Sequence, residues 1–434
     1  MYHFIGIKGA GMSSLAVIMK QLGYTVQGSD VEKHYFTEEE LIKNNIPIYS
    51  YNEENIKENQ IIIKGLSITE DNQELKKARE LNLEIINYNE MVGTLTKKYK
   101  TICIAGCHGK TTTTAMTSHV LNQIKGINYL IGDGTGYANP KNEYFALESC
   151  EYKRHFLSYT PYYAVILNID LDHVDYFKDI NDVIDAYTEF ANSTTKMIIA
   201  NGDDEKVRTM NITKPISYFG LNDNNDVIAT NIEYTKEGTS FDVIINHNKY
   251  GHFELPIYGK HQLMDSLAVI SICYHEKIEA SEVEKYFKTF SGAKRRFTET
   301  FVGNNVIIDD YAHHPNEIKS TINAIIQKYP EKLVVSIFQP HTYTRTSEFA
   351  KDIAEELSKT DIAYIMDIHP AREKQEDYPN ITKEIIINQM HNGHGLTMND
   401  AQILNQHQDA VFIFMSPNDL SKLEQALIKL KQEK

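Results

Sequence analysis

Short apolar runs alternate along the whole chain with longer segments in which apolar residues recur at helical spacing. Short apolar runs between turn residues are typical of buried strands, and the periodic segments between them are typical of helices that cover a sheet. The pattern therefore predicts an α/β fold. The runs expected to be strands are 3–7, 24–26, 60–63, 84–86, 101–105, 128–131, 144–147, 163–167, 197–200, 306–308, 333–338, 363–366 and 410–414.

A chain of 434 residues is longer than one hydrophobic core usually supports. The alternation divides naturally into three α/β domains in series. We predict an N-terminal Rossmann-like domain at 1–97, a central P-loop ATPase-like domain at 98–293 and a C-terminal Rossmann-like domain at 294–434. Residues 227–255 instead alternate apolar and polar positions, which predicts a β-rich insert in the central domain, at one of its edges.

The segment 101–114 carries the strongest chemical signal, because an apolar strand leads directly into Gly-Lys-Thr and then into a helix-compatible sequence. Gly106 and Gly109 would let backbone N–H groups surround a phosphate at a helix N-terminus, and Lys110 adds a positive charge. Thr111 would hold Mg²⁺. Only two residues separate the glycines, so this is a shortened P-loop; the alternative is a glycine-rich surface turn without a ligand.

Acidic residues follow two further strands of the predicted central sheet, so that three strand ends, with that of the Gly-Lys-Thr turn, point to one edge. Glu148 and Glu151 follow one of them, and 168–173, which ends in His173, follows the next. Ligands gather at the carboxyl edge of open α/β sheets, and Mg²⁺ needs one or two carboxylates besides phosphate oxygens. Either glutamate could serve, His173 is a weaker candidate metal ligand, and the alternative for each is a solvated loop residue.

The two outer domains carry further candidates. In the first, 9–14 forms a glycine turn after a strand, and Asp30 follows at the distance of a ribose-binding acid. Ser14 replaces the third glycine, so a tight turn without a ligand is the alternative. In the last, the guanidinium groups of 294–297 and Arg345 suit phosphate or carboxylate, although the basic triplet could also be a solvated linker.

Charge and composition exclude several function classes. The formal charge of −15 disfavours binding to nucleic acid or to an anionic membrane. No apolar stretch approaches a membrane span, and the first residues do not resemble a signal peptide, so we expect a cytoplasmic protein without membrane insertion. Four cysteines without paired spacing fit a reducing compartment. We expect a monomer or a weak homodimer.

Taken in order, these motifs resemble the Mur ligase family, and within it the branch that joins L-alanine to UDP-N-acetylmuramate. The likeness covers essentially the whole chain, and the string at 309–315 is its most specific part. The motifs that carry it are 9–14 with 28–30, 106–112, 168–173, 259–261, 294–297, 309–315 and 339–345.

The resemblance implies an ATP- and Mg²⁺-dependent ligase in peptidoglycan precursor synthesis, with UDP-N-acetylmuramate and L-alanine as substrates. The first domain would bind the UDP-sugar, the second ATP, and the third would close over both. An acyl phosphate of the lactyl carboxylate would form and then be displaced by the amine of L-alanine.

The resemblance also implies roles for single residues. Lys110, His313 and Arg345 would be catalytic, with Arg345 on the acyl phosphate, and Thr111, Glu151 and His173 would bind metal. Glu151 is preferred to Glu148 for its spacing from Phe156. The UDP-sugar would lie on Gly9, Gly11, Met12, Ser13, Ser29 and Asp30. The nucleotide would lie on Gly106, His108, Gly109, Lys110, Thr111, Thr112, His261, Asp265, Arg296 and Asp310, with Asp310 on the ribose.

Three positions depart from the family pattern. Gln262 and Asp265 stand where asparagines usually contact adenine, and an ionised Asp265 cannot donate a hydrogen bond. The turn 416–419 replaces a glycine-rich one, and 64–68 is also atypical. Alternative hypotheses are a related ligase with another amino-acid or peptide acceptor, a nucleotide-binding paralogue without catalysis, or a nicotinamide-dependent oxidoreductase, which leaves the Gly-Lys-Thr turn unexplained.

Overall fold

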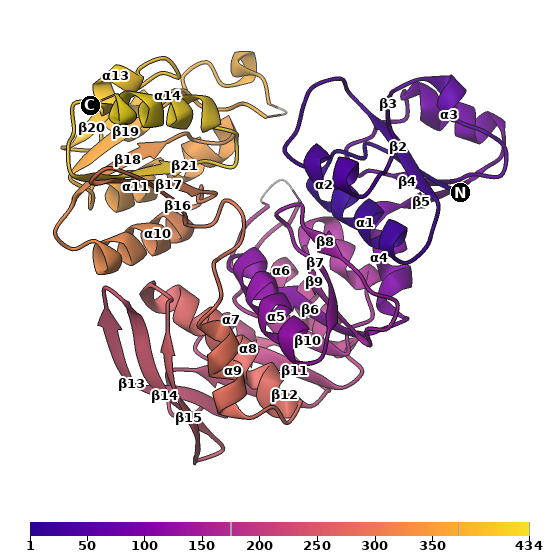
Figure 1. Cartoon of the computed structure of the whole chain (residues 1–434), viewed down its shortest axis with the longest axis horizontal. Coiled ribbons are helices and arrows are strands. Elements are labelled where there is room, and N and C mark those ends of the chain that lie inside the picture. Colours follow the sequence, from indigo (N-terminus) through magenta and orange to yellow (C-terminus); the bar gives the residue numbers. More distant parts are fainter. Residues whose placement is uncertain (174–175, 372, 434) are drawn as a thin grey trace. The chain divides into compact units, whose positions relative to one another are not determined.

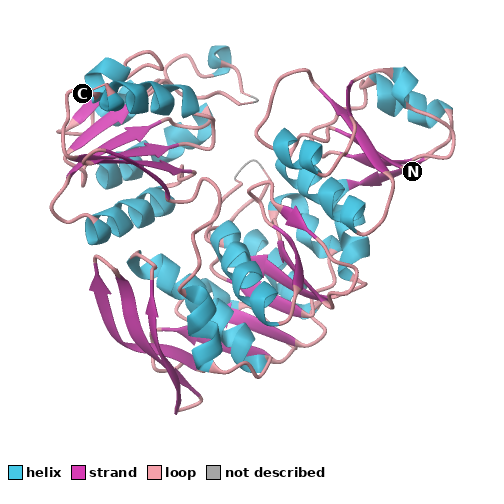
Figure 2. Cartoon of the chain, viewed as in Figure 1, coloured by secondary structure: helices cyan, strands magenta, loops and turns pink. Residues whose placement is uncertain are grey.

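The computed structural model describes residues 1–173, 176–371 and 373–433, and in this part of the chain it contains three β-sheets that follow one another along the sequence (Figure 1). Helices flank the strands in each region (Figure 2). The three-part α/β architecture predicted from the alternating pattern is therefore confirmed.

The first sheet has five parallel strands in the order β3-β2-β1-β4-β5, with β1 at its centre. Its strands are β1 (Tyr2–Ile5), β2 (Val26–Asp30), β3 (Ile48–Ser50), β4 (Ile61–Lys64) and β5 (Glu84–Asn87). Its helices are α1 (Ala10–Gln21), α2 (Glu38–Lys43), α3 (Gln73–Glu80) and α4 (Tyr88–Thr96), with a 3-10 turn η1 (Glu53–Asn55).

The glycine turn of this sheet lies earlier than the sequence predicts. The chain turns at Gly6, whose φ is +85°, and α1 already begins at Ala10 with Gly9 as its N-cap. Gly11 therefore lies inside the helix. A Cβ on Gly11 would come within 2.7 Å of the Tyr88 hydroxyl oxygen, so this glycine allows the close approach of another side chain.

The second sheet has ten strands in the order β15-β14-β13-β12-β11-β10-β6-β9-β7-β8. The predicted β-rich insert forms β13, β14 and β15 and lies at one edge of the sheet, as expected. The strands are β6 (Lys100–Ala105), β7 (Ile127–Leu130), β8 (Gly136–Tyr137), β9 (Tyr144–Glu148), β10 (Tyr163–Ile166), β11 (Met197–Asn201), β12 (Ile216–Gly220), β13 (Val227–Thr235), β14 (Gly238–Ile245) and β15 (Asn248–Leu255). The helices are α5 (Lys110–Ile124), α6 (Ile180–Asn192), α7 (Glu205–Thr209), α8 (Gly259–His275) and α9 (Ala280–Phe287), with a 3-10 segment η2 (Tyr152–Ser158).

The third sheet has the order β16-β17-β21-β18-β19-β20, in which only the edge strand β16 is antiparallel to its neighbour. Its strands are β16 (Thr298–Val302), β17 (Asn305–Asp310), β18 (Leu333–Phe338), β19 (Ile362–Ile365), β20 (Gly393–Gly395) and β21 (Ala410–Met415). Its helices are α10 (Pro315–Lys328), α11 (Tyr343–Leu357), α12 (Glu384–Ile387), α13 (Ala401–Leu404) and α14 (Ser421–Gln432), with a 3-10 turn η3 (Gln375–Asp377).

Internal contacts group the described residues into two compact units. The first comprises 1–231, 241–253 and 264–290, and the second comprises 232–240, 254–263 and 291–434. One continuous apolar core in the first unit joins α1 to the second sheet, for example through Leu15 and Leu130. In the second unit, apolar cores cover the third sheet. Among the described residues, no helix is both long and apolar enough to span a bilayer.

Candidate functional site

The candidate site lies at the carboxyl edge of the second sheet. Strand β6 runs parallel between β9 and β10, so the three segments that follow these strands leave the sheet at the same edge. These segments carry the Gly-Lys-Thr turn, the two glutamates and the acidic stretch 168–173. The predicted convergence of three strand ends is therefore confirmed, and it matches the edge where open α/β sheets bind ligands.

The turn between β6 and α5 has the backbone of a phosphate cradle. Gly106 and Gly109 have φ values of +154° and +86°, which side chains with a Cβ rarely adopt. Gly109 is the N-cap of α5. Within the described residues, no hydrogen bond takes up the backbone N–H of 109, 110, 111 or 112. These four amides therefore stand at a helix N-terminus, where an anion is favoured.

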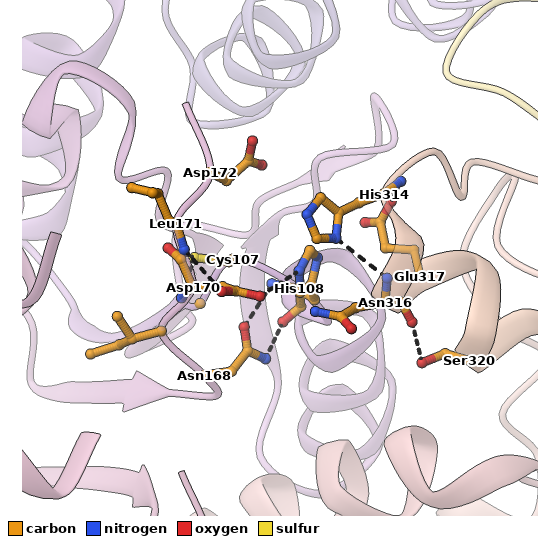
Figure 3. A network of polar contacts seen from close by, with 12 residues as sticks. Cys107, His108, Asn168, Asp170, Leu171, Asp172, His314, Asn316, Glu317 and Ser320 are labelled. Atoms are coloured by element: carbon orange, nitrogen blue, oxygen red, sulfur yellow. Dashed lines mark hydrogen bonds and ion pairs between the residues drawn. The ribbon is translucent and has the colours of Figure 1, made fainter. Parts of the chain in front are cut away.

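Asn168, which follows β10, holds the other half of the turn (Figure 3). Its side-chain carbonyl accepts a hydrogen bond from the His108 backbone N–H at 2.9 Å, and its amide donates to the His108 carbonyl at 2.9 Å. The Cys107 thiol donates to the Asp170 carbonyl at 3.1 Å. The neighbouring strand thus fixes the turn from one side while the four amides stay available.

Lys110 is the cation of the cradle. Its ammonium lies 3.1 Å from Glu151 Oε2 and donates to the carbonyls of Gly106 and Cys107. Burial acts to lower the pKa of Lys110, but the Glu151 carboxylate and other nearby groups outweigh it and raise that pKa well above its ordinary value. Lys110 therefore stays positively charged at physiological pH.

Glu148 and Glu151 have different partners: Glu148 contacts Thr111, and Glu151 contacts Lys110. Glu148 Oε2 accepts a hydrogen bond from the Thr111 hydroxyl at 2.8 Å and another from the Gly132 N–H at 3.0 Å. Glu151, which is almost fully buried, instead faces Lys110, and His173 Nε2 lies 3.9 Å from its Oε1. The family resemblance favours Glu151, whereas the carboxylate next to the Thr111 hydroxyl belongs to Glu148. Carboxylate and hydroxyl oxygens are ligand types that Mg²⁺ prefers, and metal binding by Thr111, Glu151 and His173 stays a prediction.

The remaining nucleotide candidates fall in both units. In the first unit, Asp265 is buried beside the cradle, and a Cβ on Gly109 would lie 2.7 Å from its Oδ1. His108 Nε2 lies 3.9 Å from Asp170 Oδ2, and Thr112 lies in the first turn of α5. In the second unit, burial lowers the pKa of His261 to about 4, so His261 is neutral at physiological pH. Its role in nucleotide binding stays a prediction.

Several predicted UDP-sugar residues have side chains that are engaged within the first unit. Asp30 accepts a hydrogen bond from the Lys8 N–H at 2.7 Å and thereby fixes the turn after β1. Ser29 is fully buried and donates to Glu74. Ser13 donates to the Ala10 carbonyl at 3.0 Å, and Met12 is buried. The hydroxyl of Ser29 therefore faces the interior, while Gly9 remains exposed at the helix start.

In the second unit, predicted residues lie at the carboxyl edge of the third sheet. Asp310 is buried and accepts hydrogen bonds from the N–H groups of Phe297 (2.8 Å) and Ala312 (2.9 Å) and from Thr321 (3.1 Å). His313 Nδ1 lies 3.1 Å from Glu317 Oε2. Asp310 thus fixes the turn that carries His313, and its contact with ribose stays a prediction.

Arg296 and Arg345 lie in the same unit. An Arg296 nitrogen lies 3.8 Å from Glu317, and its guanidinium lies over the Tyr311 ring, 4.9 Å from the centroid. Arg345 lies in the first turn of α11, after Thr342, a β-branched residue with a φ of +65°. Such a conformation is rare and clusters at functional sites, which fits a role for this turn.

Sequence reasoning missed two anchoring residues. Arg295 donates to the carbonyls of 416, 417 and 418 at 2.8–3.2 Å and to Asp309 at 3.1 Å, so it holds the atypical turn after β21. Glu373 accepts hydrogen bonds from the N–H groups of Tyr343 and Thr344 at the start of α11. The run Lys294-Arg-Arg signalled Arg295 only as a general cation, and no local motif marks Glu373.

His314 and its neighbours cap the start of α10 (Figure 3). His314 is the N-cap of α10, with its Nδ1 3.4 Å from the Asn316 N–H, and the Ser320 hydroxyl donates to the Asn316 carbonyl at 2.8 Å. Pro315 occupies the first position of the helix, where its missing N–H costs nothing. The string at 309–315 is thus a strand end followed by a capped helix start.

A glycine turn, a charged lysine and two carboxylates at one edge of the central sheet give the chain the arrangement that P-loop nucleotide sites use. Models of one enzyme family match three consecutive parts of it. Residues 1–100 match the model "Mur ligase family, catalytic domain", 104–273 match "Mur ligase middle domain", and 295–419 match "Mur ligase, glutamate ligase domain". The chain belongs to the Mur ligase family, whose members are ATP-dependent amide-bond ligases.

Solved structures agree on the fold. The UDP-N-acetylmuramate–alanine ligase MurC of Thermotoga maritima is 23% identical with a TM-score of 0.83, and the likeness covers 100% of this chain and 99% of that one. A murein peptide ligase of Psychrobacter arcticus is 21% identical, with a TM-score of 0.73 and coverage of 100% and 99%. The MurF ligase of T. maritima in complex with ADP is 15% identical, with a TM-score of 0.65 and coverage of 96% and 97%.

Proposed function

We propose that the protein joins L-alanine to the lactyl carboxylate of UDP-N-acetylmuramate, with ATP cleaved to ADP and phosphate, in peptidoglycan precursor synthesis. The observation that carries this proposal is the cradle itself: four available amides, a charged lysine and two carboxylates at one sheet edge of a Mur ligase fold. The likeness to the alanine ligase along the full length of both chains supports the choice of substrates.

The residues of the cradle suit the difficulty of this reaction, in which a carboxylate must approach a triphosphate. The amides of 109–112 and the Lys110 ammonium would take up phosphate charge and so reduce the repulsion between the two anions. Bound Mg²⁺ would neutralise further phosphate charge. Thr111 with Glu148 offers candidate oxygen ligands, and Glu151 with His173 offers further candidate ligands.

The ion pair between Lys110 and Glu151 affects how a nucleotide would bind in the cradle. Lys110 donates to Glu151 and to the carbonyls of the turn, so a phosphate group must share this ammonium with them. The Glu151 carboxylate and the phosphates are both anions, and a cation between them would remove the repulsion. We therefore expect nucleotide binding to depend strongly on Mg²⁺.

The proposal is tested by phosphate release from the purified chain with ATP and Mg²⁺. Release should require UDP-N-acetylmuramate and L-alanine together, and Lys110→Ala should lower the rate by a factor on the order of 10²–10³, because it removes a preorganised positive charge. Lys43→Ala is the matched control, since Lys43 lies in α2 and its side chain is 75% exposed. Release that is independent of either substrate, or unaffected by Lys110→Ala, would contradict the proposal.

A second candidate is a ligase for a preformed peptide, which the likeness to the murein peptide ligase favours. The same assay separates the two, because L-alanine and an L-alanyl tripeptide can be offered in turn as the acceptor. The proposal predicts product with the free amino acid. Product with the peptide alone would establish the second candidate.

A further inference from the structure

The turn that follows Glu151 has a backbone that ordinary residues avoid. Lys153 and Arg154 are consecutive, both carry a Cβ, and both lie in the left-handed region, with φ values of +50° and +56°. Single residues visit this region at some cost, and two in succession persist only where their surroundings hold them. Something in the first unit must therefore hold this turn.

The Arg154 side chain supplies that hold through helix α6. Its Nη2 lies 2.6 Å from Asp182 Oδ1 and 3.3 Å from the Asp182 carbonyl oxygen, while Nη1 lies 3.8 Å from Glu189. The pair is partly buried, with about a quarter of each side chain exposed. Asp182 Oδ2 also accepts from the Lys178 N–H at 3.2 Å, so the carboxylate is fixed at the start of the helix.

The held turn leads directly to the site. The Arg154 N–H donates to the Glu151 carbonyl at 2.8 Å. Arg154 therefore connects the backbone of Glu151 to α6, because its guanidinium pairs with Asp182 of that helix. Phe156 secures the far end of the turn, because its buried ring stacks on Phe190 of α6 at a centroid distance of 4.5 Å. The Glu151 carboxylate, which precedes both anchors in the chain, lies 3.1 Å from the Lys110 ammonium.

The partner of Glu151 on its other side is held in a similar way. His173 also has a positive φ, +54°, and its ring lies 4.7 Å from the ring of Tyr152. Tyr152 belongs to the same turn as Arg154. A displacement of this turn would therefore move Glu151 and the surface on which His173 rests together.

We propose that Arg154 and Asp182 are positioning residues: their ion pair holds the strained turn that directs Glu151 between Lys110 and His173, and thereby sets how much Mg²⁺ nucleotide binding requires. The inference rests on the proposed function, because it assumes that a Mg²⁺-nucleotide binds in the cradle. A structural role alone would give a different result, because an ion pair that only fastens α6 would change stability and leave the Mg²⁺ requirement as it is.

The test is ADP binding to the purified full chain, measured by calorimetry over a series of Mg²⁺ concentrations, with the melting temperature of each variant recorded. Arg154→Gln and Asp182→Asn should each raise the Mg²⁺ concentration needed for half-maximal affinity by a factor on the order of five, and the double variant should do no more than either, because the two residues act as one unit. Arg154→Lys, which keeps the charge, should recover part of the effect. Arg79→Gln is the matched control, since Arg79 of α3 forms an exposed ion pair with Glu70 in the turn before that helix.

The outcomes separate this inference from the proposed function. An unchanged Mg²⁺ requirement in Arg154→Gln and Asp182→Asn, with or without a lower melting temperature, would overturn the positioning role and leave the ligase proposal standing. Failure of the unaltered chain to bind ADP at any Mg²⁺ concentration would overturn both.

Discussion

The side chain of Asn168 holds the turn between β6 and α5. Its side-chain amide both donates to and accepts from the backbone of His108. These two hydrogen bonds resemble those that a residue of a paired strand would make with His108. Aspartate could accept but not donate, and alanine could do neither. The asparagine therefore sets the shape of the turn without using the backbone N–H groups of 109–112.

We predict that Asn168→Ala destabilises the fold by about 1–3 kcal/mol, because it leaves a backbone donor and acceptor without their partners. It should also weaken ADP binding, and Asn168→Asp should fall between alanine and the native residue. Chemical denaturation and calorimetry measure the two effects. Unchanged ADP affinity in Asn168→Ala would show that the turn keeps its shape without this clamp.

Glu276 is a second residue whose environment has a measurable consequence. Burial acts to raise its pKa, but hydrogen bonds from Lys125, Tyr144, Lys196 and Tyr163 prevail and lower it from 4.5 to about 2. An acid whose pKa is lower in the folded state stabilises the fold above its unfolded pKa, and this contribution is lost as the pH falls through the folded value. The relevant window is therefore from about pH 4.5 down to about pH 2.

We predict that Glu276→Gln lowers the free energy of unfolding by roughly 2 kcal/mol at pH 7 and that the difference from the native chain shrinks between pH 4.5 and 2. Denaturation curves over this range measure it. Glu143→Gln is the control, because Glu143 is 72% exposed and pairs only at the surface with Lys100. A difference that stays constant with pH would contradict the assignment.

At the scale of elements, the strand-turn-helix unit β6–α5 was predictable because its signal is local. Glycines at fixed places, an apolar run before them and a helix after them are all visible in 101–114. The start of α1 was misplaced because Gly9 and Gly11 were both assigned to a turn, whereas Gly6 makes the turn and Gly11 admits Tyr88. That contact joins α1 to α4, so no local pattern contains it.

Two glycines with similar φ values, Gly109 and Gly23, differ in the space available to a Cβ, and this difference gives a prediction for the cradle. Gly109 and Gly23 have nearly the same φ, +86° and +91°, but a Cβ on Gly109 would meet Asp265 Oδ1 at 2.7 Å while one on Gly23 would meet nothing within 4 Å. Gly23→Ala should cost only the conformational strain, about 1–2 kcal/mol, and leave ADP binding unchanged.

Gly109→Ala should cost at least as much stability and should also weaken ADP binding by a factor on the order of ten or more, because the added methyl displaces the first amide of the cradle. Thermal denaturation and calorimetry compare the two variants directly. Equal ADP affinity in both would show that the backbone of Gly109 does not face the ligand.

At the scale of the whole molecule, the order of strands and helices was visible in the sequence and the grouping of the sheets was not. The apolar runs predicted three sheets, and the β-rich insert lies at a sheet edge as expected. The first two sheets share one compact unit, since α1 contributes Leu15 to a core with residues of the second sheet. Glu148 and Glu151 were both candidates, and the sequence could not show that Glu148 contacts Thr111, because this contact arises only when β6 and β9 pair.

In the proposed function, the cradle around Lys110 serves the transfer of a phosphoryl group to a carboxylate. The most direct measurement uses UDP-N-acetylmuramate labelled with ¹⁸O in its lactyl carboxylate, together with ATP, Mg²⁺ and L-alanine, and follows the label by mass spectrometry. If the carboxylate attacks the terminal phosphorus and the amine then expels phosphate, one labelled oxygen appears in each phosphate released. Phosphate without label, formed alongside the ligation product, would contradict the account.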